Sequence, residues 1–273
     1  MKGEAPVNET RRRLVRTVVR LAVVAAALGA WQLYANRAGN PYLLPPSVVF
    51  PALYRQWFDG PASHLWLNAD ATANLLPSLG RMLAGLAIAS VAGIALGVAI
   101  GRSALLSDLV EPAVHFARAV PPPMLVPVFL YVIGIGTPME IVSIVFGVLW
   151  VVLLNAIDGA RHVHPGHLET ARAFKIPPVQ RLTRIILPSA APKIFAGLRL
   201  GVALALVMMI VSEFVGSFNG IGGEVIVAQG SGQISVMWAV IVILGILGVI
   251  LNLLLVVAER FVLSWQQPVY GGA

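Results

Sequence analysis

The sequence contains no cysteine. A disulfide framework, a zinc site built on thiolates and an iron–sulfur cluster are therefore excluded. Charge is also scarce, because Asp, Glu, Lys and Arg make up 11% of the 273 residues, against about 25% in a typical soluble domain. With 58% hydrophobic residues and a mean hydropathy of +0.84, the chain is neither disordered nor a soluble globular protein. The remaining class is a multi-span membrane protein.

Motifs for catalysis or nucleotide binding are missing as well. No G-x-x-x-x-G-K-[ST], H-E-x-x-H or G-x-S-x-G sequence occurs, and the nearest string, 97–103, lacks the spacing and the lysine of a phosphate-binding loop. His162, His164 and His167 lie together, but Pro165-Gly166 makes this stretch a turn and no carboxylate pattern completes a metal site. We therefore expect no catalytic residue, no metal site, no cofactor on this chain and no ATP hydrolysis by it.

Six apolar segments approach the length that a membrane-spanning helix needs, about 20 residues. One is interrupted by Pro121, Pro122, Pro123 and Pro127, and such a span is tolerated where protein surrounds the freed backbone groups. The predicted fold class is all-α, a polytopic membrane protein with six transmembrane helices. The predicted spans are 15–34, 75–100, 109–133, 142–157, 194–215 and 236–258.

The basic residues predict the orientation. Most of the 19 Lys and Arg residues fall before the first span, after the second, between the fourth and fifth, and after the sixth. Cytoplasmic loops are enriched in Lys and Arg, so both termini are predicted to be cytoplasmic, in the bacterial plasma membrane. A cleaved signal peptide is the alternative for the first span and leaves five spans. Because the basic residues flank apolar runs, they do not indicate a nucleic-acid partner.

These segments divide the chain into four regions. Residues 1–35 hold the basic N-terminus and the first span. Residues 36–74 form an extracytoplasmic loop with a short amphipathic helix, expected mainly to pack on the bundle. Residues 75–265 form a five-span core that includes a cytoplasmic segment, 161–188. Residues 266–273 form a cytoplasmic tail.

Ionisable groups inside a membrane are costly and often functional. Glu213 lies near the outer end of the fifth span, where we expect a gate, a helix-pairing anchor or an interfacial carboxylate in contact with water. Arg81 and Arg118 are expected to extend toward lipid headgroups, and attraction of an anion in the path is the alternative for either residue. Gly93, Gly97 and Gly101 predict a close helix contact. The predicted translocation path is made of backbone groups freed at the proline break, packing methionines and the acid: Pro121, Pro122, Pro123, Met208, Met209 and Glu213.

The segment between the fourth and fifth spans carries Leu168, Ala171, Arg172 and Lys175 at helical spacing. This spacing predicts a short helix with a small-residue face and a basic face. The small face would let a second protein approach closely, and the basic face would meet acidic groups. A plain basic loop held near lipid headgroups is the alternative.

The same segment resembles the EAA motif of ABC-importer permeases, E-A-A-x3-G-x9-I-x-L-P. Thr170 replaces an Ala of the motif. Lys175 replaces its Gly, so the double proline Pro177-Pro178 is expected to break the helix instead. The resemblance implies that this segment is the coupling helix that docks on an ATPase. The residues implied in coupling are Glu169, Thr170, Ala171, Arg172, Lys175, Ile185, Leu187 and Pro188.

Further motifs extend the resemblance over residues 42–265. They are LLPPS at 43–47, LGRMLAG at 79–85, AVPPP at 119–123, GIG at 134–136, AGLRLG at 196–201 and SEF at 212–214. The chain is similar to permeases of the sulfonate, taurine and nitrate family with the type I, methionine-importer-like fold. The resemblance implies a homodimer of permeases, two ATPase subunits that hold ATP and Mg, and an extracytoplasmic solute-binding protein, working by alternating access.

The resemblance favours an organosulfonate, such as an alkanesulfonate or taurine, as the transported solute. Nitrate and a small heterocyclic vitamin precursor stay open as alternatives. A secondary transporter driven by an ion gradient is the less favoured reading, because it predicts several buried titratable residues and inverted repeats.

Overall fold

The computed structural model describes residues 7–64, 66–217 and 219–264. The predicted tail 266–273 and the basic residue Lys2 lie outside the described residues. All the regular elements in the described part of the chain are helical. They are α1 (Val7–Ala38), α2 (Pro46–Trp57), η1 (Ala62–His64), η2 (Ala71–Leu75), α3 (Leu76–Gly101), α4 (Ala104–Ala119), α5 (Pro122–Ile133), α6 (Thr137–Arg161), α7 (Pro165–Ala173), α8 (Pro178–Arg181), η3 (Leu182–Ile186), α9 (Leu187–Gly216), α10 (Ile221–Gly230) and α11 (Ile234–Val262).

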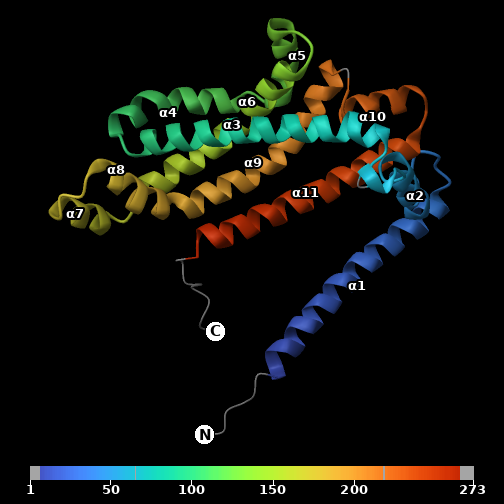
Figure 1. The fold of residues 1–273 in the computed structure, drawn as a ribbon, viewed down its shortest axis with the longest axis horizontal. Helices are drawn as coiled ribbons and strands as arrows, with labels where there is room; N and C mark the ends of the chain where they lie inside the picture. The colour runs from blue at the N-terminus through green and yellow to red at the C-terminus, as the bar shows by residue number, and fades with distance from the viewer. Residues whose placement is uncertain (1–6, 65, 218, 265–273) are drawn as a thin grey trace.

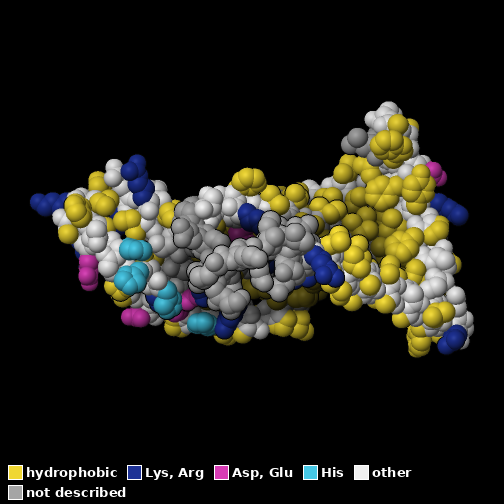
Figure 2. Space-filling model, turned by 90° about the horizontal axis from the view of Figure 1, so that it is seen from below, with side chains coloured by type: hydrophobic (Ala, Val, Ile, Leu, Met, Phe, Trp, Pro, Cys, Tyr) yellow, Lys and Arg dark blue, Asp and Glu magenta, His cyan; other side chains and the backbone are white. Residues whose placement is uncertain are grey.

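Helices α3, α6, α9 and α11 run along the long axis of the molecule (Figure 1). Helix α6 is central, because α3 and α9 both pack against it along their lengths. The short helices α7 and α8 lie at one end of the bundle, and α2 and α10 at the other (Figure 1). We call these the α7 end and the α10 end. Figure 2 shows histidines gathered toward the α7 end and a broad hydrophobic area over the other half.

Five helical runs are long and apolar enough to cross a membrane. They are Leu14–Ala38, Ala71–Gly101, Thr137–Arg161, Pro178–Gly216 and Ile234–Val262. The sixth predicted span corresponds to α4 and α5, which meet at an angle of 91° and make a sixth span only if the bent pair crosses the membrane as one. The predicted all-α fold class is confirmed, and the described residues hold five or six candidate spans against the six predicted.

The proline run causes the break between α4 and α5. A proline disfavours the helical conformation in the residue before it. Val120 precedes Pro121 and has ψ 120°, and Pro121 precedes Pro122 and has ψ 118°, so both residues are extended. Pro122 then opens α5, where its missing N–H costs nothing. Pro127 lies inside α5 without ending the helix.

Glycines bring α3 against α6. A Cβ on Gly97 would lie 2.6 Å from the carbonyl oxygen of Leu153, which is too close for any side chain. Cβ atoms on Gly93 and Gly101 would likewise meet the backbone of α6. The close contact predicted from the four-residue spacing is confirmed, and it lies within this chain.

Helix α2 packs on α11, and its buried face is formed by Val49, Leu53 and Trp57. This is the segment for which a short amphipathic helix packed on the bundle is expected from the sequence. Helix α1 diverges from the bundle (Figure 1). Its C-terminal part, the end nearest the bundle (Figure 1), contacts α11 through the tilted rings of Trp31 and Trp238, whose centroids lie 5.3 Å apart.

Candidate coupling segment and buried charge network

Helix α7 begins at a histidine cap. The ring of His164 accepts a hydrogen bond of 3.2 Å from the backbone N–H of Gly166, and Pro165 occupies the first helical position. The rings of His164 and His167 lie 5.5 Å apart. Nowhere in the described part of the chain do three or more His, Cys, Asp or Glu side chains lie together as a metal site would need. The histidines thus shape the start of α7.

Helix α7 ends in a Schellman motif centred on Lys175. The N–H of Lys175 donates to the carbonyl of Arg172 at 3.0 Å, and the N–H of Ile176 donates to that of Ala171 at 2.9 Å. This motif needs a left-handed residue, and Lys175 has φ +52°. The lysine thus adopts the conformation that glycine adopts most readily. The expectation that the double proline breaks the helix is wrong, because α7 ends before it and Pro178 instead begins α8.

The small-residue face of α7 is turned inward. Ala171 is only 1% exposed, and Leu168 packs against Val163 and Ile186. The prediction that Ala171 belongs to a face open to a second protein is therefore wrong. The inward face anchors α7 to the start of the long helical run that becomes α9.

Some of the predicted coupling residues meet around a cavity of about 470 Å³ between α7 and the start of α9. Thr170 and Ala171 line it from α7, and Ile185 and Pro188 line it from the other side. Glu169, Arg172, Lys175 and Leu187 are not among its lining residues. The predicted set therefore splits into an inner group around this cavity and an outer group of Glu169, Arg172 and Lys175, while Leu187 packs against the hydrophobic core.

The outer group forms a charged and partly apolar surface. Glu169, Arg172 and Lys175 are exposed, and none of them makes an ion pair with another described side chain. Phe174 and Val179 beside them are 78% and 72% exposed. Exposed apolar side chains next to unpaired charges are typical of a surface that contacts another protein.

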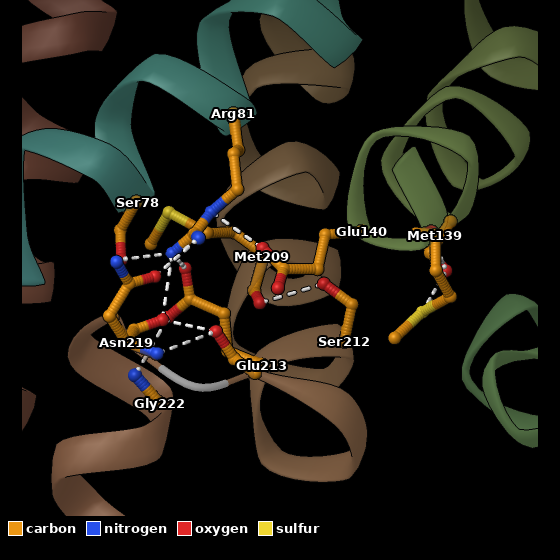
Figure 3. A network of polar contacts seen from close by, with 12 residues as sticks. Ser78, Arg81, Met139, Glu140, Met209, Ser212, Glu213, Asn219 and Gly222 are labelled. Carbon is orange, nitrogen blue, oxygen red and sulfur yellow. Dashed lines mark hydrogen bonds and ion pairs between the residues drawn. The ribbon is translucent and has the colours of Figure 1, made fainter. Parts of the chain in front are cut away.

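A buried charge network joins α3, α6 and α9 near the α10 end (Figure 3). Nη2 of Arg81 lies 2.8 Å from Oε1 of Glu213, and its Nε lies 2.5 Å from Oε2 of Glu140. The three side chains are 7%, 0% and 1% exposed. One guanidinium thus faces two carboxylates out of contact with water, and such a cluster depends on every partner being in place.

The loop before α10 completes this network. Asn219 accepts hydrogen bonds from Arg81 through Oδ1 at 2.9 Å and through its backbone oxygen at 3.0 Å. The N–H of Gly222 donates to Oε2 of Glu213 at 2.8 Å. Gly220 has φ +127°, and a Cβ there would lie 2.6 Å from Nη2 of Arg81. Glycine is therefore required for the backbone to pass this close to the ion pair.

The network corrects two expectations. Arg81 does not extend toward lipid headgroups, because it is 6% exposed and paired with two acids. Glu213 is not an interfacial carboxylate in water, because it is buried and pairs α9 with α3. The helix-pairing anchor, one of the roles expected for Glu213, is the one that this geometry fits.

Glu140 and Asn219 were not predicted from the sequence as members of a functional site. The apolar pattern placed the start of the fourth span at residue 142, whereas α6 begins at Thr137 and buries Glu140 in its first turn. Asn219 lies in a glycine-rich turn that carries no charge. A signal for Glu140 was available in the sequence, because acidic residues outnumber the single base Arg81 at this end of the spans.

The other residues of the predicted path do not all lie in one place. Met208 is 1% exposed, and both Met208 and Pro122 lie next to Gly147 of α6. Met209 is fully buried in the main hydrophobic core. The path set therefore divides: Met208 and Pro122 lie beside the α4–α5 break, whereas Met209 and Glu213 lie at the charge network (Figure 3).

Comparison with known proteins gives consistent matches. Residues 89–264 match the family model described as "Binding-protein-dependent transport system inner membrane component". The chain is 29% identical to a nitrate import permease protein, NrtB, of Synechocystis sp., over 92% of this chain and 91% of that one. It is 25% identical to a putative aliphatic sulfonates transport permease protein, SsuC, of Bacillus subtilis, over 92% and 88%. It is 26% identical to a bicarbonate transport system permease protein, CmpB, of Synechococcus elongatus, over 93% and 92%.

Among solved structures, the fold resembles the MetNI methionine ABC transporter in inward-facing conformations. The TM-score is 0.54 at 22% identity, over 71% of this chain and 96% of that one. The predicted type I permease fold is confirmed. Together with its apolar helices, the family match makes this a multi-pass inner membrane protein. The family model covers more than half of the chain, which therefore belongs to the family of binding-protein-dependent transport system inner membrane components.

Proposed function

We propose that this chain is the permease subunit of an ATP-driven importer that moves a small oxyanion across the membrane by alternating access. The main support is the exposed surface of α7, which combines unpaired charges with neighbouring apolar side chains. The opposite face of α7 packs against the start of the helical run that becomes α9. The family match supports the same reading. The chain opens a path for the solute, and the partner ATPase supplies the chemistry, binding ATP and Mg.

The relatives support a small oxyanion as the solute. Their names refer to nitrate, aliphatic sulfonates and bicarbonate, which all carry negative charge on oxygen atoms. An organosulfonate, the solute first favoured, and nitrate stand equally in this respect. A heterocyclic vitamin precursor lacks that shared chemistry and is the weaker candidate.

The orientation follows from charge. Arg172, Lys175, Arg181 and Arg184 cluster at the α7 end, and basic residues favour the cytoplasmic side. We place the ATPase at this end, on α7, and the extracytoplasmic solute-binding protein at the α10 end. We also propose that two copies of this chain form the permease, as a homodimer.

Co-purification with the ATPase encoded beside this chain tests the proposal. The wild type, Glu169→Arg and Asp59→Arg are compared in detergent, because Asp59 is also an exposed acid but lies at the α10 end. The wild type and Asp59→Arg should retain the ATPase, whereas Glu169→Arg should lose it because an added positive charge disturbs the docking surface. Retention of the ATPase by Glu169→Arg would contradict the coupling role. If no ATPase binds the wild type, an ion-gradient-driven carrier replaces the importer.

Uptake measured with the purified complex in liposomes identifies the solute. Nitrate, bicarbonate and an alkanesulfonate are compared with a neutral heterocycle, each with the matching binding protein and with ATP inside. Uptake of an oxyanion alone, dependent on ATP, is expected. Uptake of the neutral heterocycle alone would overturn the proposed solute class.

A further inference from the structure

Helix α4 has three distinct sides. Val110 and Val114 pack with Leu153 and Ile157 of α6. A second side is apolar but exposed. The third side is polar and carries residues spaced three, four and three positions apart, within an arc of about 80°. The exposed apolar residues are Leu105, Leu109 and Phe116, and the polar residues, called here the α4 polar stripe, are Asp108, Glu111, His115 and Arg118.

The stripe runs inward from the α7 end. Glu111 forms an ion pair with Arg161, the last residue of α6, which marks the charged boundary of the bundle. Arg118 lies seven residues further along α4, about 10 Å deeper. It stands one residue before the end of α4, next to the proline break. Its guanidinium therefore lies toward the interior of the membrane, where exposing a charged side chain to lipid costs free energy.

Arg118 differs from the basic residues of the neighbouring core helices. In α3, α6 and α9 each basic residue is paired with an acid: Arg81 with Glu140 and Glu213, Arg161 with Glu111, Lys193 with Asp158, and Arg199 with Glu259. Arg118 is exposed and makes no ion pair with the side chains that the structure describes. Its positive charge therefore remains available to a solute.

We infer that the α4 polar stripe lines a water-filled path from the proline break to the α7 end, and that Arg118 is the residue that attracts the transported anion. The inference rests on the proposed function only in taking the solute to be an anion. A guanidinium presents its N–H donors in a planar fork that matches two oxygen atoms of an oxyanion. Helical side chains lean toward the helix N-terminus, which for Arg118 is the direction of His115 and the stripe.

The order of charges along the stripe suits release as well as capture. Arg118 lies at the inner end, Glu111 is neutralised by Arg161, and Asp108 is an exposed acid nearer the α7 end. An anion is therefore attracted by Arg118 inside the membrane and repelled by Asp108 near the α7 end, where the path opens. A transport site has to bind strongly enough to admit the solute and weakly enough to release it.

Single cysteines test the path, because the chain has none of its own. His115→Cys on the stripe is compared with its neighbour Phe116→Cys on the exposed apolar side, at nearly the same depth. Inside-out vesicles are treated with a charged, membrane-impermeant methanethiosulfonate reagent. The cysteine at 115 should react at least about tenfold faster than the cysteine at 116. Equal rates at the two positions would overturn the path.

The charge of Arg118 is tested in the His115→Cys background. The reaction rate of an anionic sulfonatoethyl reagent is divided by that of a cationic trimethylammonioethyl reagent. This ratio should fall about tenfold in Arg118→Gln and stay high in Arg118→Lys, because a focused positive charge raises the local anion concentration by this order. An unchanged ratio in Arg118→Gln would show that Arg118 lies among lipid headgroups and overturn its role.

These measurements need neither the ATPase nor an identified solute. A loss of ATPase binding in Glu169→Arg together with equal labelling at 115 and 116 would support the importer function and overturn the proposed path along α4. Normal ATPase binding in Glu169→Arg together with the expected labelling would support the path along α4 and overturn the proposed coupling role of the α7 surface.

Discussion

Nη2 of Arg81 on α3 lies 2.8 Å from Oε1 of Glu213 on α9, and both side chains are almost completely buried. Their residues are separated by 132 positions in the sequence. The pair therefore fixes two spans to each other at the α10 end, in an environment where neither charge can be compensated by water.

Arg81→Gln should destabilise the protein by about 3–5 kcal/mol, because removal of one partner leaves a buried charge uncompensated. The free energy of unfolding in detergent measures this loss. Arg199→Gln is the matched control, because Arg199 pairs with Glu259 but is 48% exposed, and an exposed pair contributes about 1 kcal/mol or less. Similar losses in both variants would contradict the structural role of the buried pair.

Gly97→Val should loosen the packing of α3 against α6. A Cβ at this position would lie 2.6 Å from the carbonyl oxygen of Leu153 and from Cβ of Ala156, so the helices have to separate. Overpacking of this kind costs about 1–3 kcal/mol. Thermal unfolding measures the effect, with Gly80→Ala as control because a Cβ on Gly80 has no heavy atom within 4 Å. The prediction fails if the two variants melt alike.

Lys175→Gly should preserve the turn after α7, whereas Lys175→Val should disrupt it. A left-handed residue with a side chain costs about 1–2 kcal/mol, and a β-branched residue tolerates this conformation least. Hydrogen exchange at the Ile176 amide, which donates to Ala171, reports the turn directly. Exchange should be unchanged or slower in Lys175→Gly and faster in Lys175→Val. Equal exchange in both variants would mean that the left-handed residue does not hold the turn.

Glu224 on α10 predicts a pH dependence of stability. Burial raises the pKa of its carboxyl above the usual 4.5, while the hydrogen bond from Gln56 of α2 acts in the opposite direction. A carboxyl with a raised pKa stabilises the folded state while protonated. That contribution is present below about pH 4.5 and is lost as the pH rises through the raised value.

The variant Glu224→Gln removes this titration. It should melt at a higher temperature than the wild type at pH 8, and the difference should shrink as the pH is lowered toward 5. The Tm of both proteins across this range is the measurement. A difference that stays constant with pH would show that Glu224 does not titrate in the folded protein.

The spans and the α7 segment were predictable because each depends on a pattern within one stretch of sequence. Apolar length marks the membrane helices, and the proline run marks the break after α4. The four-residue spacing of Gly93, Gly97 and Gly101 marks a close helix contact, but it does not tell which helix is the partner. In each case the signal lies within one stretch of the sequence.

The charge network was not predictable in the same way. Arg81 and Glu213 meet only after α3 and α9 have packed on α6, and Glu140 joins them because α6 starts earlier than the apolar pattern indicates. The inward orientation of Ala171 also depends on tertiary packing, since helical spacing defines the faces of α7 but not which face meets the bundle. Likewise, the Lys175 backbone is left-handed, although sequence preference alone favours a glycine there.

Helices α8, η3 and α9 form one uninterrupted helical run of 39 residues, from Pro178 to Gly216. At 1.5 Å per residue it is about 58 Å long. One end is joined to the turn that closes α7, and the other carries Glu213 and its bond to the loop before α10. The run therefore has the form of a lever. If a partner docks on α7 as proposed, a tilt of this run would also move Glu213 at the opposite end of the molecule.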